Sequence, residues 1–152
     1  MTNYVSNINT IPIGGDNFDG QPITYFPKGN ILSGVTLAGG RFYTYSLIDL
    51  LPSDSAIYDY EVTFSGLGRS ASSSGNMTHL VLLSGTQTSD VGGWRLNRVQ
   101  IRNNNNSYAG GSAIIPIFHT DRNITVWTED CSTNSANVQL WIAYCRRLGN
   151  NV

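Results

Sequence analysis

Few side chains in this 152-residue chain could do acid–base or nucleophilic chemistry, and they include two histidines and ten acids. His119 lies two residues before Asp121, and alternate residues of a strand face the same way, so the two could act as a base and an acid. No serine stands in the G-x-S-x-G turn that presents a nucleophile. A histidine at a strand end is more often a hydrogen-bonded structural group, and we predict that role for His119.

A zinc site or a phosphate-binding loop is equally weakly supported. Zinc would have to use His79, His119, Cys131 and Cys145, which lack the close paired spacing of structural zinc ligands. Gly39 and Gly40 form a glycine pair, but this segment lacks the lysine and the following helix of a phosphate-binding loop. The sequence therefore predicts no metal and no cofactor.

Glycoside hydrolysis would need two carboxylates that flank a sugar. Glu61, Glu129 and Asp130 are candidates only because acids are scarce, and Glu61 fits the solvated side of a strand. We therefore predict no catalytic residues and a protein that is not an enzyme.

The two cysteines are predicted to be free thiols. If residues 123–130 and 137–144 form a hairpin, Cys131 sits at its turn and Cys145 at its far end. At about 3.3 Å per residue this separates them by more than roughly 20 Å, whereas a disulfide needs Cα atoms within about 7 Å. Free thiols agree with a reducing compartment.

Binding is better supported than catalysis, because the chain carries three tryptophans and eight tyrosines. Their flat amphipathic rings stack on sugars or anchor protein interfaces. Tyr58 and Tyr60 fit the core, whereas Tyr108 follows a run of four asparagines and fits a displayed loop. The candidate surface-recognition loop consists of Asn103, Asn104, Asn105, Asn106 and Tyr108. Both a glycan and a protein remain open as its ligand.

Composition limits the class of protein and its partners. The length fits one domain, and charged residues make up only 12% of it, about half the usual share. The formal charge of −1 argues against nucleic acid as a partner. Few surface charges also give weak protection against self-association, which suits a protein that assembles.

No targeting or membrane segment is evident in the sequence. Residues 1–13 lack the basic region and apolar run of a secretory signal, and no stretch reaches the roughly 18 apolar residues of a membrane span. We therefore expect synthesis in a cytoplasm and no membrane insertion.

The C-terminal strand, residues 137–145, organises the prediction. Val138, Leu140, Ile142 and Tyr144 alternate as a core row. The opposite row also contains apolar side chains, which favours a second layer or a neighbouring subunit. Trp127 likewise lies opposite a core row in its own strand. The candidate oligomer interface is Trp127, Trp141 and Ala143.

Alternation and turn signals predict about eight strands. The seven with expected bounds are residues 41–50, 57–65, 77–83, 94–102, 112–119, 122–129 and 137–145. Residues 57–65 are expected to form an outer strand with one solvent-exposed face. The core face of this strand would carry Tyr58, Tyr60, Val62 and Phe64. Pro116 restricts its strand to an edge or a bulged position, and a shift of the apolar phase predicts a bulge near residues 97–98. The fold class is therefore an all-β, jelly-roll-like antiparallel sandwich over residues 38–152.

Residues 1–37 are predicted to form an irregular N-terminal arm, because glycine and proline punctuate them throughout. They are too apolar for a disordered tail, so the arm packs on its own domain or attaches to a partner. The candidate anchor residues are Ile11, Ile13, Phe18, Tyr25 and Phe26.

The chain resembles tailed-bacteriophage fibre proteins, including head fibres. The resemblance lies in the order of a Gly/Pro-rich arm, L-P-S-D-S-A-I-Y-D-Y-E-V-T-F-S-G at residues 51–66, a Ser-rich loop and V-Q-L-W-I-A-Y at residues 138–144. It implies a homotrimer that is made in the host bacterial cytoplasm and displayed on the virion surface. The arm would bind a capsid or tail protein, and the loops would bind a host glycan or surface protein. A free carbohydrate-binding lectin is the alternative.

Overall fold

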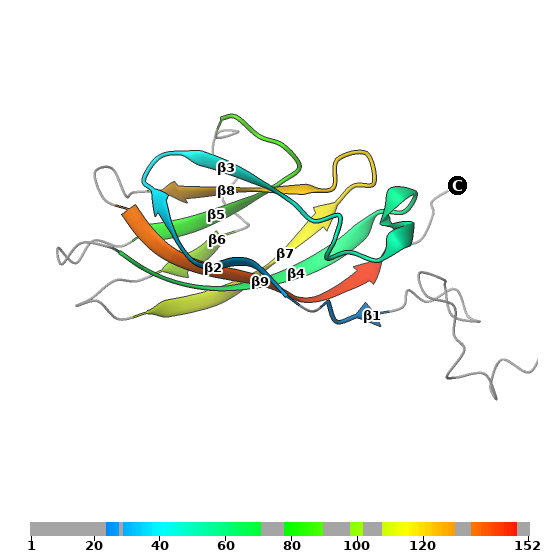
Figure 1. The fold of residues 1–152 in the computed structure, drawn as a ribbon, viewed down its shortest axis with the longest axis horizontal. Coiled ribbons are helices and arrows are strands. Elements are labelled where there is room, and N and C mark those ends of the chain that lie inside the picture. Colours follow the sequence, from blue (N-terminus) through cyan, green and yellow to red (C-terminus); the bar gives the residue numbers. More distant parts are fainter. Residues whose placement is uncertain are drawn as a thin grey trace, which may run out of the picture.

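The fold is an antiparallel β-sandwich, seen here in a computed structural model that describes residues 24–27, 29–70, 78–89, 98–101, 108–129 and 135–148. Two sheets face each other, and the core lies between them (Figure 1). The predicted all-β antiparallel sandwich is confirmed. Among the described residues, no helix is long and apolar enough to cross a membrane.

The five-stranded sheet, hereafter the large sheet, has the order β1-β9-β4-β7, and β2 also pairs with β9. The four-stranded sheet, hereafter the small sheet, has the order β3-β8-β5-β6. The strands are β1 Thr24–Tyr25, β2 Asn30–Ala38, β3 Phe42–Ser46, β4 Tyr60–Ser70, β5 Thr78–Ser84, β6 Arg98–Ile101, β7 Ala109–Ile117, β8 Asn123–Glu129 and β9 Ser135–Arg147. A short 3-10 helix, η2 (Ser53–Ala56), precedes β4.

The core is built from alternate residues of both sheets, as the period of two predicts. Tyr60, Val62 and Phe64 of β4 are all fully buried. Facing them are the buried side chains of the small sheet, Leu80, Leu82, Ile124 and Val126. The expectation that this segment forms an outer strand was wrong, because β4 pairs with β9 on one side and β7 on the other.

β9 carries a bulge that the sequence pattern did not indicate. Thr63 pairs with Tyr144, but the next residue of β4, Phe64, pairs with Ile142, so Ala143 is the extra residue. The inward row shifts by one position beyond it. Cys145 is therefore fully buried and Tyr144 is 38% exposed, so the prediction that Tyr144 belongs to the core row was wrong.

Residues 30–38 were predicted to be irregular but form strand β2. Its Leu32 and Leu37 are buried in the core. Two register irregularities interrupt its pairing with β9, and Gly34 adopts a positive φ of 68° within the second. These irregularities explain why this part of the chain shows no clean alternation.

The other predicted strands are present, although several begin or end at other residues than predicted. β7 is an edge strand, as Pro116 predicts, although it begins at Ala109 inside the predicted loop. β5 and β8 lie where strands were predicted, and β3 is shorter than its predicted range. The predicted bulge near residues 97–98 involves Asn97, which lies outside the described residues.

Candidate functional site

The side of the large sheet that faces away from the small sheet carries exposed apolar side chains. Thr63, at its centre, pairs with Tyr144 on β9 and with Ile114 on β7, so the three form one row across the sheet. Phe26 extends this row, because its ring centroid lies 6.2 Å from that of Tyr144 at a tilt of 54°. Phe26 is 73% exposed and Ile114 55%. A solvated sheet face would be polar at these positions.

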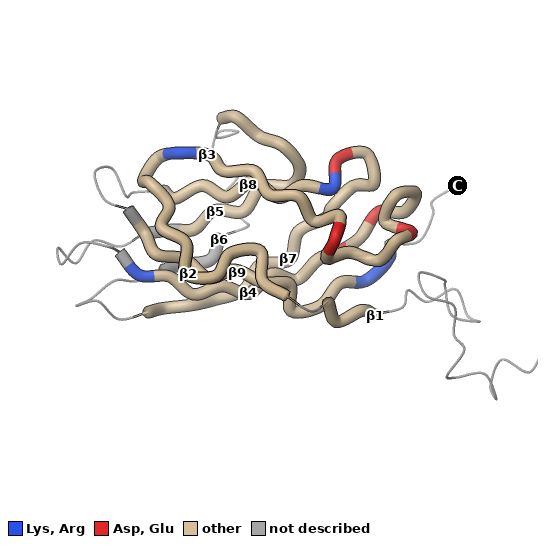
Figure 2. The backbone as a smooth tube through the Cα atoms, in the orientation of Figure 1, with Lys and Arg blue, Asp and Glu red and all other residues tan. Residues whose placement is uncertain are grey.

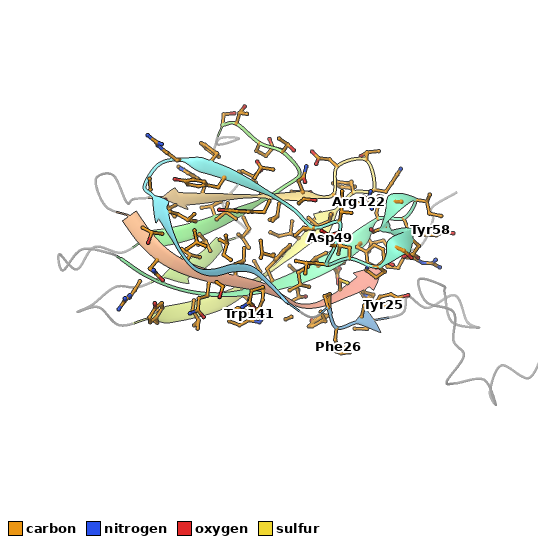
Figure 3. All side chains as sticks on the ribbon, in the orientation of Figure 1. Tyr25, Phe26, Asp49, Tyr58, Arg122 and Trp141 are labelled. Carbon is orange, nitrogen blue, oxygen red and sulfur yellow. The ribbon has the colours of Figure 1, made fainter. Side chains whose placement is uncertain are left out.

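Trp141 occupies the neighbouring row of the same face. It pairs with Ser65 on β4 and with Asn30 on β2, and it is half-buried. Figure 3 shows Trp141 and Phe26 on the side of the large sheet turned away from the small sheet. We call this surface the outer face and define it by Phe26, Thr63, Ser65, Ile114, Trp141 and Tyr144.

The hydroxyl of Thr63 is the polar group at the centre of the outer face. Thr63 is only 7% exposed although it points away from the core, because its neighbours in the row cover it. Its Oγ1 has no hydrogen-bond partner among the described residues. Leaving a buried hydroxyl unsatisfied costs about 1–3 kcal/mol of stability, so this position is a local cost to the fold.

In the part of the chain that the structure describes, charged residues lie at the ends of the strands and in turns, and the middle of each sheet carries none (Figure 2). On the large sheet, Arg146 donates to Glu61 at 3.0 Å near one end. Near the other end, Arg69 lies 4.9 Å from the ring centroid of Tyr108. The outer face between these two positions can therefore be covered by an apolar partner without burying a charge.

Two of the predicted interface residues lie near each other in the structure, and the third does not. Trp141 and the bulge residue Ala143 belong to β9 of the large sheet. Trp127 belongs to β8 of the small sheet, where its ring stacks on Phe42 at 5.3 Å and 10°. Trp127 therefore lies in the other layer from Trp141 and cannot share one flat interface with it.

Three residues of the predicted recognition loop and anchor lie in the described part of the chain: Tyr108, Tyr25 and Phe26. Tyr108 is 43% exposed, and its hydroxyl donates to Asn137 Oδ1 at 3.1 Å. Tyr25 packs against the Tyr60 ring at 6.1 Å, and burial raises the pKa of its hydroxyl. Phe26 points outward. The remaining predicted residues, Asn103, Asn104, Asn105, Asn106, Ile11, Ile13 and Phe18, lie outside the described part of the chain.

The possible acid–base pair of His119 and Asp121 is separated. His119 bonds to Asp59 instead, through its ring Nδ1 at 2.7 Å and its backbone N–H at 2.9 Å. Asp121 accepts from the backbone N–H of Thr86 at 2.8 Å and from Asn123 Nδ2 at 2.7 Å. His119 is therefore hydrogen-bonded, as predicted, but its partner is Asp59 and not Asp121.

A polar cluster that the sequence analysis missed closes one end of the sandwich. The Tyr60 hydroxyl donates to Asp54 Oδ1 at 2.6 Å, and Arg147 Nη1 lies 3.4 Å from Asp54 Oδ2. The Arg147 guanidinium also lies 4.1 Å from the ring centroid of Tyr58. Nothing in the sequence spacing links these positions, since Arg147 reaches the cluster only through the pairing of β9 with β4.

The cluster is suited to structure and not to nucleophilic chemistry. Burial and then the Asp54 carboxylate raise the pKa of the Tyr60 hydroxyl, and burial raises the pKa of the Cys145 thiol to about 12. Both groups are therefore protonated at neutral pH. Cys145 is a free thiol, as predicted.

Among the described residues, no group of three or more His, Cys, Asp or Glu side chains could hold a metal ion.

Comparisons with known proteins find distant structural similarity and no related sequence. No protein-family model matches the chain, and no curated protein matches it. The matching solved structures include the coat protein of Tobacco streak virus, with a TM-score of 0.45 and 13% identity over 88% of this chain and 90% of that one. A likeness this distant is no basis for inferring a shared function.

Proposed function

We propose that the protein is a non-enzymatic structural component of a virion that assembles into a homo-oligomer through the outer face. The observation that carries the proposal is the row of Phe26, Tyr144, Thr63 and Ile114, with Trp141 beside it. Aromatic side chains of this kind are typical anchors of protein interfaces. A second copy of the chain would remove the exposed rings from water.

A second copy is the occupant that the charge distribution favours. Among the described residues, the outer face has no charged side chain between the Glu61–Arg146 pair and Arg69, so two copies can meet there without repulsion or buried charge. The whole chain has a formal charge of only −1, so repulsion between copies is weak. A strongly charged partner would find no complementary group at this surface.

The virion role rests on the resemblance to phage fibre proteins, which implies a homotrimer and attachment through the N-terminal segment. β1 lies at the edge of the large sheet (Figure 1). Phe26 follows β1 directly in the chain, and its ring packs against Tyr144 of the outer face. In this proposal a capsid or tail protein binds residues near Ile11, Ile13 and Phe18, and the loop that contains Tyr108 is displayed toward the host surface.

The oligomer is tested by measuring molar mass with light scattering across a range of concentrations. We expect a multiple of the 16.6 kDa chain and a smaller mass for Ile114→Ser. Ile57→Ser is the matched control, because Ile57 is 63% exposed but lies in the turn before β4, away from the outer face. A monomeric native protein at high micromolar concentration would contradict the proposal.

Attachment is tested separately with a chain that lacks residues 2–23 and keeps β1. We expect this chain to form the same oligomer but not to co-sediment with particles of the virus that encodes it. Incorporation equal to that of the full chain would show that the N-terminal segment is not the anchor.

A further inference from the structure

A groove of about 450 Å³ lies on the small sheet, on the other layer from the outer face. The start of β3 forms one wall, and the loop that follows β5 forms the other. Its lining residues are Gly40, Arg41, Phe42, Thr44, Thr86, Gln87 and Thr88. The groove therefore presents three hydroxyls, an amide, a guanidinium and one aromatic ring.

The loop wall is held in place by hydrogen bonds to β8 and to the turn before it. The backbone N–H of Thr86 donates to Asp121 Oδ2 at 2.8 Å, and that of Gln87 donates to Thr125 Oγ1 at 3.0 Å. Gly85 allows the sharp entry to this loop, with a φ of 72° and only 2.9 Å between the position of a Cβ and Asp121 Oδ2. The wall is thus preorganised before any ligand binds.

The hydrogen-bonding directions of two lining groups are fixed by their neighbours. Thr125 Oγ1 donates its one hydrogen to the Gly85 carbonyl at 2.7 Å, so the Thr44 hydroxyl, 3.0 Å away, must donate to Thr125. Thr44 therefore has only acceptor capacity left. Gln87 Nε2 donates to the Ser84 carbonyl at 3.1 Å, which fixes the plane of its amide.

The aromatic wall is rigid as well. One face of the Phe42 ring is covered by Trp127, with the two rings stacked at 5.3 Å and nearly parallel at 10°. Stacking of this kind fixes the Phe42 side chain in one orientation. A fixed apolar ring beside hydroxyl and amide groups matches a sugar, which has C–H faces and hydroxyl edges.

Arg41 supplies the charge of the groove. Its side chain is exposed, and no ion pair ties it to a carboxylate within the described part of the chain. A guanidinium binds a carboxylate through two parallel hydrogen bonds. A groove for a neutral sugar would not need a cation, so the Arg41 guanidinium indicates a ligand with a negative charge.

We propose that the groove binds a saccharide unit that carries a carboxylate. Arg41 binds the carboxylate, Thr44 and Gln87 bind ring hydroxyls, and Phe42 packs on the apolar face of the ring. This site is distinct from the predicted loop at Tyr108, which lies at the start of β7 in the large sheet. It does not depend on whether the copies assemble.

The test starts from a glycan array that includes tri-galacturonate, sialyllactose and a hyaluronan tetrasaccharide beside neutral oligosaccharides. The strongest acidic binder is then titrated into ¹⁵N-labelled full-length protein. We expect the amide resonances of Thr44, Thr86, Gln87 and Thr88 to shift. Loss of the bidentate contact in Arg41→Gln is expected to weaken binding by about tenfold or more.

Arg69→Gln is the matched control, because Arg69 lies beside Tyr108 and not in the groove. It is expected to leave the affinity unchanged, and Phe42→Ala to weaken it. The proposal is overturned if no acidic glycan binds, if the shifts gather around Tyr108, if neutral glycans bind the groove equally well, or if Arg41→Gln binds like the native protein.

Discussion

The hydroxyl of Tyr60 donates a 2.6 Å hydrogen bond to Asp54 Oδ1, which joins the first residue of β4 to the helix η2 that precedes it. Tyr60 is fully buried, and the same carboxylate lies 3.4 Å from Arg147 at the end of β9. This contact therefore ties a turn and two strands of the large sheet together at one end of the sandwich.

Removing that hydroxyl tests the contribution of the cluster to stability. Tyr60→Phe keeps the ring in the core but leaves one Asp54 oxygen without its donor. A hydrogen bond to a charged group contributes about 1.5–3 kcal/mol, and we expect a loss of this order in the free energy of unfolding measured with urea. Tyr58→Phe is the control, because the structure records a cation–π contact for its ring but no hydrogen bond for its hydroxyl. Equal stability of the two variants would contradict the assigned role.

The bond between Asp59 and His119 predicts how stability changes in acid. Burial raises the pKa of Asp59, but hydrogen bonds from the backbone and ring of His119 outweigh it and hold the pKa below its ordinary value. A carboxyl with a lowered pKa in the folded state stabilises the fold above its unfolded pKa of about 3.9. That stabilisation is lost as the pH falls through the lower, folded-state pKa.

Asp59→Asn is therefore expected to flatten the acid limb of a plot of thermal midpoint against pH between about 2 and 5. Asp49→Asn serves as the control, because Asp49 is an exposed aspartate in the turn that follows β3. The same acid slope in native protein and Asp59→Asn would exclude this linkage.

Close approach of β7 to β4 predicts that Gly110 tolerates no side chain. A Cβ at this position would lie 2.6 Å from the Gly66 carbonyl oxygen and 2.5 Å from Leu67 Cδ2. Gly110→Ala should separate the strands and lower the free energy of unfolding by about 1–3 kcal/mol, the usual effect of overpacking. Gly40→Asn is the comparison, because its site has open space and asparagine tolerates a positive φ. A stable Gly110→Ala protein would show that the strands can move apart freely.

The thiol of Cys145 should be unreactive in the folded protein. Burial, the larger cause, and then the Asp54 carboxylate raise its pKa to about 12, and the side chain is fully buried. In a Cys131→Ser background we expect labelling by a disulfide reagent at pH 8 only at the rate of unfolding. Rapid stoichiometric labelling in native buffer would place this thiol at the surface.

The sequence by itself determined the fold class and the inward rows of most strands. The alternation of Tyr60, Val62 and Phe64 is a local property of the chain, because it arises wherever one side of a strand is buried in the core. Pro116 similarly limited its strand to an edge or a bulge, because a proline has no N–H to offer a neighbour, and β7 is an edge strand. A hydrogen-bonded His119 was likewise expected from its place near the end of a strand.

The tertiary structure alone decided which residues share a surface. The bulge at Ala143 turns Tyr144 outward and Cys145 inward, and a bulge depends on the register between two strands. Phe26, Thr63, Ile114 and Tyr144 come from four distant parts of the chain and meet only because β9, β4 and β7 are neighbours. The groove beside Phe42 likewise needs the loop after β5 to fold back over β3. Local periodicity carries no information about such pairings, which is why they could not be predicted.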